Sequence, residues 1–216
     1  MADETWVLWA LGAVFLGVGI HLILHGRRRT RLLRGFATRN GLSYEARPPE
    51  SLAEKLTETF RPSGDGRVRA FSNVRDVVSD GRVRLLKCVE LLDLSPWGES
   101  QNLHFSRIAA LFPVDPRHTH WAVYRPDGSR PRRAGPGSFA ESTASREIEA
   151  VLAEHPPEHP LSVTLARGQG LAYLKPLRVG SEQEEELRYL LQLGRMLADR
   201  FDEARSRATS NAMPRI

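Results

Sequence analysis

Residues 161–176 read LSVTLARGQGLAYLKP, and residues 184–201 read EEELRYLLQLGRMLADRF. Apolar residues occupy alternate positions from Leu161 to Leu165, which is the period of a half-buried strand, and the ARGQG run marks a turn before the chain returns. In the second stretch apolar residues recur every three or four positions, as on one face of a helix. The end of the chain therefore predicts a β-hairpin followed by a long helix that ends near Arg205.

Two local features define this C-terminal helix. Ser181 followed by Glu184 is a capping-box pattern at its start. Gly194 lies on its apolar face, where glycine costs up to about 1 kcal/mol of helix propensity. We therefore expect a neighbouring element to pack closely against Gly194.

A strand-rich block precedes this unit. A short strand is expected at 42–46, upstream of the block. The strand-like segments of the block itself are 68–74, 82–92, 102–112 and 119–124, and turn residues such as Asp80-Gly81 separate them. Their simplest arrangement is an antiparallel β-meander. Helical periodicity appears at 51–60 and 144–154, and the Pro- and Gly-rich residues 126–143 suggest a flexible surface loop. The expected fold class is α+β, over residues 42–205, with a disordered tail at 206–216.

The N-terminus carries a different pattern. Residues 6–24 contain no formal charge, and nineteen residues of helix extend about 28 Å, close to a ~30 Å hydrocarbon core. Trp6 and Trp9 lie at one end, where indoles favour the membrane interface. Residues 1–26 are therefore expected to hold a single transmembrane helix. A cleaved signal peptide is the alternative, but its n-region should be basic and a small-residue cleavage site should follow the apolar run.

A cluster of arginines follows the apolar run: Arg27, Arg28, Arg29, Arg31, Arg34 and Arg39. By the positive-inside rule it stays in the cytoplasm, which places the N-terminus outside the bacterial inner membrane and the domain inside. Residues 27–41 are expected to form a basic juxtamembrane helix, either continuous with the apolar one or resuming after Gly26. The expected membrane-anchoring residues are Trp6, Trp9, Arg27, Arg28, Arg29 and Arg31.

The charge distribution argues against a nucleic-acid partner. The chain carries +5 overall, but residues 27–39 carry +6 and residues 40–216 only +1. This local basic excess suits anionic lipid headgroups, at about 1 kcal/mol per residue near the surface. The single cysteine, Cys88, excludes an intrachain disulfide, and its place in a predicted strand indicates a buried apolar role.

Several of these segments together resemble a known set of proteins. The apolar span, the arginine cluster, residues 40–45 (NGLSYE) and residues 60–74 (FRPSGDGRVRAFSNV) resemble a loose set of uncharacterised bacterial single-pass membrane proteins, and residues 161–201 are similar to theirs in layout. Members of that set tend to have a tyrosine-rich strand after the first hairpin, where this chain has KCVEL at 87–91. The resemblance implies a topology with a cytoplasmic α+β domain, and it assigns no catalytic residue.

One histidine lies within the apolar run. Ala13, Gly17 and His21 recur at intervals of four, so two small residues share a helix face with an ionisable one. That face suits close packing of another helix, or a tetrapyrrole whose metal His21 ligates. A histidine hydrogen-bonded to water near the headgroups is the simpler interpretation.

A second candidate site lies at the start of a predicted strand. His118 and His120 are two residues apart, so they point to one face and could hold a metal with a third ligand. The nearby candidates for that ligand are Asp115, His104 and Glu90. Two histidines in such a place more often pack or face solvent. No phosphate loop, nucleophile elbow or zinc-protease motif occurs in the sequence.

These observations favour a non-enzymatic accessory or scaffold subunit that presents a cytoplasmic α+β domain to a membrane complex. Its expected partners are membrane lipid and other membrane protein subunits, without nucleic acid and without a definite cofactor. Two alternatives stay open. One is an enzyme whose site lies between the meander and the C-terminal hairpin and helix, and the other is a sensor module that binds anionic lipid.

Overall fold

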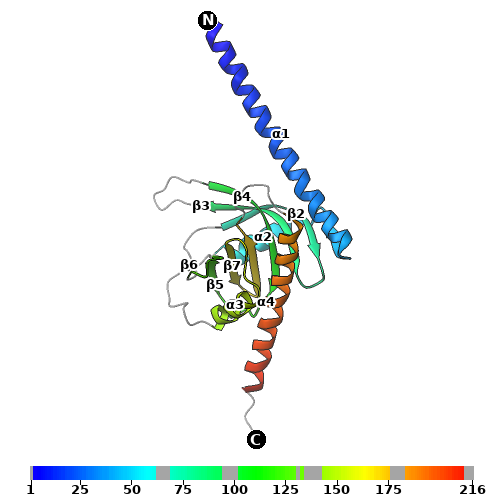
Figure 1. Ribbon diagram of the computed structural model, residues 1–216, viewed down its shortest axis with the longest axis vertical. Coiled ribbons are helices and arrows are strands. Elements are labelled where there is room, and N and C mark those ends of the chain that lie inside the picture. The colour runs from blue at the N-terminus through cyan, green and yellow to red at the C-terminus, as the bar shows by residue number, and fades with distance from the viewer. Residues whose placement is uncertain are drawn as a thin grey trace.

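The computed structural model describes residues 2–61, 69–93, 102–129, 132–133, 143–175 and 183–211. Over these residues the fold is α+β, with one antiparallel sheet and helices on both of its faces (Figure 1). The helices are α1 (Ala2–Arg39), α2 (Ser51–Phe60), α3 (Thr143–Glu154) and α4 (Glu184–Asn211). The strands are β1 (Ser43–Glu45), β2 (Arg69–Ser79), β3 (Arg84–Asp93), β4 (Asn102–Pro113), β5 (His120–Tyr124), β6 (Arg132–Arg133), β7 (Leu161–Ala166) and β8 (Gln169–Leu174).

The strand order is β1-β2-β3-β4-β8-β7-β5-β6, so the expected meander holds only as far as β4. The C-terminal hairpin β7–β8 enters the sheet between β4 and β5, and β5 pairs with β7 instead of β4. Gly170 allows this insertion because it lies opposite Phe112 in the β4–β8 register. A Cβ atom at Gly170 would lie 2.2 Å from the Phe112 ring, so only glycine fits beside that ring.

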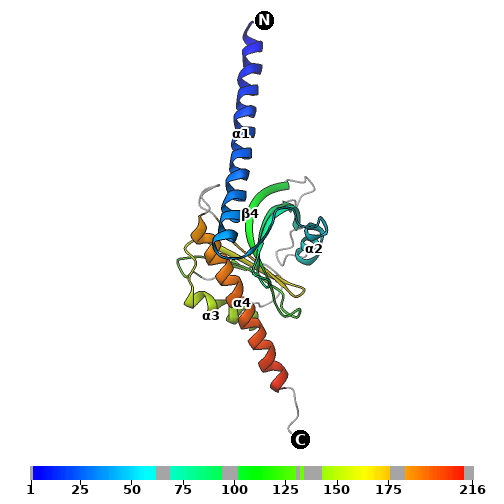
Figure 2. The ribbon, with the colours of Figure 1, turned by 90° about the vertical axis from the view of Figure 1, so that its right-hand side faces the viewer.

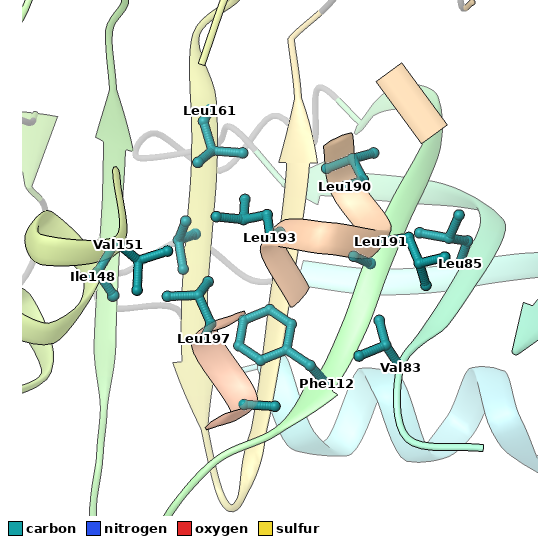
Figure 3. Packing of buried hydrophobic residues seen from close by; sticks show 14 of the residues in the cluster. Val83, Leu85, Phe112, Ile148, Val151, Leu161, Leu190, Leu191, Leu193 and Leu197 are labelled. Carbon is teal, nitrogen blue, oxygen red and sulfur yellow. The ribbon is translucent and has the colours of Figure 1, made fainter. Parts of the chain in front are cut away.

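The two faces of the sheet carry separate cores. Figure 2 shows α1, α3 and α4 on one side of the sheet and α2 on the other. Figure 3 shows the larger core, in which Leu190, Leu193 and Leu197 of α4 cluster with Phe112 and other buried residues of the strands. A Cβ atom on Gly194 would lie 2.8 Å from Val83 Cγ1, which confirms the predicted close neighbour. The smaller core packs Leu56 and Phe60 of α2 against the opposite face.

The second half of α1 belongs to the domain. Leu33, Phe36 and Ala37 are buried in the larger core, and α1 contacts β1, β2 and α4. The first half projects beyond the sheet, away from the end where α4 protrudes (Figure 1). One unbroken helix thus joins the apolar N-terminal segment to the folded domain, with no interruption at Gly26.

The structure corrects the expectation of a transmembrane helix. Among the described residues, no helix is both long enough and apolar enough to cross a membrane. The apolar segment at the start of α1 continues without a break into the arginine-rich half of the same helix. Of the two arrangements expected for the basic helix, the structure has the continuous one, and the buried apolar residues described in α1 all lie in its C-terminal half.

The chain also differs from expectation near its end and in its longest predicted loop. Helix α4 continues to Asn211, past the expected end at Arg205, and residues 212–216 lie outside the described residues. Arg132 and Arg133, expected in a loop, pair with β5 as the short strand β6. The rest of that predicted loop, at 130–131 and 134–142, lies outside the described residues, as does Ser181 of the predicted capping box.

Candidate functional site: a basic pocket beside α1

A pocket with a volume of about 490 Å³ lies where α1 passes over the edge of the sheet. Four parts of the chain build it: the middle of α1, the segment after β1, the centre of β2, and β3. The lining residues are Ile23, Gly26, Arg27, Thr30, Arg31, Ala46, Arg47, Arg75, Asp76 and Lys87. Five of these side chains are cationic and one is anionic.

An irregularity in β2 forms one wall of the pocket. The β2–β3 register shifts on both sides of Arg75, and Asn73 and Asp76 adopt positive φ angles of 49° and 54°. Such bulges re-aim side chains out of the regular alternation. Arg75 pairs directly opposite Lys87 in the register, and the two line the same pocket.

Asp76 is the organising residue of the pocket floor. It is 4% exposed, and its carboxylate accepts hydrogen bonds from the Tyr44 hydroxyl at 2.6 Å and from Thr30 Oγ1 at 2.8 Å. Lys87 Nζ lies 3.6 Å from the same carboxylate and donates to the Gly26 carbonyl at 3.3 Å. These contacts join α1, β1, β2 and β3 at one point, so Asp76 fixes the helix against the sheet.

The pKa of Tyr44 reflects this arrangement. Burial, together with the hydrogen bond to Asp76, raises the pKa of the Tyr44 hydroxyl to about 12. The phenol is therefore neutral at physiological pH and acts as a permanent donor to Asp76. The Asp76 charge is thus balanced locally by two hydroxyl donors and the Lys87 ammonium.

The charges of the arginines around the pocket are not balanced by nearby carboxylates in this way. Arg27, Arg31, Arg47 and Arg75 are all exposed. Within the described residues, no ion pair joins any of these four guanidinium groups to a carboxylate. With Lys87 and Asp76 included, the pocket has a formal net charge of +4. Chemically, this arrangement suits an anion with several oxygen atoms, because arginine forks bind such groups bidentately.

The structure separates the arginines that the sequence grouped as membrane anchors. Arg27 and Arg31 line the pocket and Arg28 is exposed, but Arg29 turns into the domain and is only 3% exposed. Its guanidinium donates to Ser106 Oγ at 2.6 Å. Arg29 therefore holds α1 to β4 and does not belong to the exposed basic surface.

The other N-terminal candidates lie on the projecting half of α1. Trp6 and Trp9 are exposed. Ala13 and Gly17 are exposed too, and a Cβ atom added to Gly17 would meet nothing within 4 Å. The side chain of His21 lies outside the described residues. Helix packing at Ala13 and Gly17, and a cofactor at His21, stay predictions.

The structure gives His118 and His120 separate surroundings. His118 packs against Phe201 of α4, with ring centroids 5.2 Å apart. His120 is buried, and its Nε2 atom lies 3.0 Å from the Tyr124 hydroxyl. Of the residues proposed as a third ligand, Asp115 binds Arg117 and Glu90 binds Arg107, while the side chain of His104 lies outside the described residues. In the described part of the chain, no three His, Cys, Asp or Glu residues gather in a way that could hold a metal.

Sequence reasoning missed the pocket residues that α1 does not supply: Arg47, Arg75, Asp76 and Lys87. One signal was present, because Lys87 shares a face of β3 with the apolar residues Leu85, Val89 and Leu91. A lysine in the middle of an apolar strand face indicates a buried partner or a ligand. The bulge that brings Asp76 close to it has no such sequence signature.

No family model, curated protein or solved structure matches this chain. The resemblance drawn from the sequence motifs therefore stays a prediction, and the functional proposal rests on the geometry.

Proposed function

We propose that this protein is a non-enzymatic accessory subunit that attaches to membrane lipid through the first half of α1 and presents its α+β domain to a partner protein. The observation that carries the proposal is the exposure of large apolar side chains on α1. These residues are Trp6, Trp9, Leu11, Val14, Phe15, Leu16, Ile20, Ile23 and Leu24.

The distribution of these side chains favours lipid over a groove on one partner. Successive helix residues point about 100° apart, so Val14, Phe15 and Leu16, each more than 60% exposed, cover different sides of the helix. A groove on a protein covers one stripe of a helix, whereas an apolar medium covers all of it. Soluble monomers rarely expose apolar patches larger than roughly a few hundred Å².

The rigid connection between α1 and the sheet supports a presenting role. Phe36 is fully buried in the larger core, and Arg29 and Thr30 bind Ser106 and Asp76. No loop separates the apolar segment from the domain, since α1 continues from one to the other. Attachment of the apolar segment would therefore hold the sheet and α4 at a fixed height and orientation for a partner.

Vesicle flotation of the full chain tests lipid attachment. Phe15→Glu with Ile20→Glu should abolish flotation, because the two carboxylates would have to enter lipid. The matched control is Thr38→Glu with Ser206→Glu, which adds the same charge at exposed positions outside the apolar segment. The control should float like the natural chain, and equal loss in both variants would refute attachment through α1.

Gentle solubilisation of the tagged protein from its native host tests the accessory role. The protein should elute with a stable, stoichiometric partner that is retained at high dilution. A strictly monomeric particle in mild detergent would contradict the proposal.

A further inference from the structure

We propose that the basic pocket beside α1 binds the phosphate group of an anionic phospholipid. This inference rests on the proposed attachment to lipid and gives it a chemical specificity. It uses residues from four separate parts of the chain, so it differs from a general attraction of the arginine-rich helix to a charged surface.

The position of the pocket along α1 points to a lipid. Ile23 lines the pocket, and Ile20 and Leu24 are exposed beside it. One turn further on, Arg27 and Arg31 line the same pocket. A molecule with an acyl chain along the apolar half of α1 would therefore place its headgroup phosphate among the pocket arginines.

The charges in the pocket select an anion. Asp76 already has its oxygen atoms occupied by Tyr44 and Thr30, with Lys87 close by. Lys87 is held in place by the Gly26 carbonyl, so it supplies a fixed positive charge at the pocket floor. The exposed guanidinium groups of Arg47 and Arg75 are left to bind phosphate oxygens bidentately.

Arg47 and Arg75 provide the sharpest test because they do not belong to the arginine cluster on α1. Arg47 follows β1, and Arg75 is placed by the β2 bulge. Both are exposed and neither is paired to a described carboxylate, so their replacement should leave folding intact. A diffuse electrostatic attraction would treat them like any other exposed arginines.

The experiment compares binding of the full chain to phosphatidylcholine vesicles with and without phosphatidylglycerol. The natural chain should prefer the anionic vesicles. Arg47→Gln with Arg75→Gln should reduce that preference about tenfold while leaving binding to phosphatidylcholine unchanged. Arg61→Gln with Arg125→Gln removes the same charge from exposed positions outside the pocket and should change the preference by less than about twofold. Arg47→Lys with Arg75→Lys keeps the charge without the planar fork and should fall between the natural chain and the glutamine variant.

The remaining outcomes separate the pocket from the proposed function. Equal losses in the Arg47/Arg75 glutamine variant and the Arg61/Arg125 control would refute phosphate binding in the pocket and leave lipid attachment intact. Equal binding of the natural chain to both kinds of vesicle would have the same consequence. No binding to either kind would refute lipid attachment itself. Calorimetric titration with inorganic phosphate tests whether the site binds free phosphate instead of a lipid headgroup. Saturable phosphate binding as tight as binding to anionic vesicles, and lost in the Arg47/Arg75 glutamine variant, would refute the lipid proposal and assign the pocket to free phosphate.

Discussion

Replacement of Asp76 by asparagine should lower the stability of the protein and at the same time strengthen its binding to anions. The buried carboxylate joins α1 to the sheet through Thr30, Tyr44 and Lys87, so its charge contributes to folding. The same charge lies in the floor of a pocket whose other charged lining residues are all cationic. The two effects therefore have opposite signs, whereas general damage to the fold would lower both stability and binding.

The magnitude of the stability loss follows from the geometry. Removal of one partner from a fully buried ion pair costs about 3–5 kcal/mol. Here the pair is 3.6 Å long and the Lys87 side chain is 18% exposed, while asparagine retains an acceptor for the Tyr44 hydroxyl. We therefore expect a loss of about 2–3 kcal/mol in the free energy of unfolding, measured by urea titration. Asp76→Ala should cost about 1 kcal/mol more, because alanine tolerates the positive φ angle at this position less well than asparagine.

The affinity for anionic vesicles should rise about fivefold in the Asp76→Asn variant, which corresponds to about 1 kcal/mol for one charge near the ligand. The assay is the same vesicle titration used for the pocket arginines, at constant salt. A parallel loss of stability and affinity would mean that Asp76 only shapes the pocket. Unchanged stability would refute the assigned role of the carboxylate in holding α1.

Other sites give independent predictions. The pKa of Tyr44 is raised from 10 to about 12. The stability that its neutral hydroxyl contributes is therefore complete below pH 10 and is lost as the pH rises towards 12. The free energy of unfolding, measured as a function of pH, should show this loss in the natural chain and not in Tyr44→Phe. Burial, with a smaller contribution from Glu90, raises the pKa of the Cys88 thiol to about 12, so a thiol reagent at pH 8 should label it only after denaturation. Gly194→Leu should cost about 1–3 kcal/mol in urea titration by forcing apart α4 and Val83, and a neutral result would contradict the close packing. Phe36→Ala should cost about 3–5 kcal/mol by the same measurement, since the ring is fully buried between α1 and the sheet.

Local patterns in the sequence predicted most individual elements of the fold. The helix expected at 51–60 is α2, and the strand expected at 102–112 is β4 within one residue. The hairpin β7–β8 and the helix after it also form as expected. These elements carry their own periodicity and turn residues, so each is specified by its own sequence.

The order of the strands could not be predicted in the same way. The alternation of apolar and polar residues shows which face of a strand is buried, but it does not show which neighbouring strand it pairs with. The hairpin lies beside β4 with Gly170 opposite the Phe112 ring, where a larger residue would clash, and that contact joins residues far apart in the sequence. The candidate site depends on the same kind of long-range contact, since the β2 bulge brings Asp76 under Thr30 of α1.

Gly26 shows how the tertiary contacts determine the shape of α1. By sequence it is a weak point, because a glycine inside a helix costs up to about 1 kcal/mol and here separates an apolar half from a basic one. In the structure its carbonyl accepts a hydrogen bond from Lys87 Nζ, which crosses from the sheet, and lies 3.2 Å from Thr30 Oγ1, whose hydroxyl donates to Asp76. A Cβ atom added at this position would lie 3.9 Å from Lys87 Nζ, an ordinary van der Waals contact, so the lysine passes directly beside the helix here. Lys87, at the floor of the basic pocket, therefore links the sheet to α1 at the glycine that separates the apolar half of the helix from the basic half.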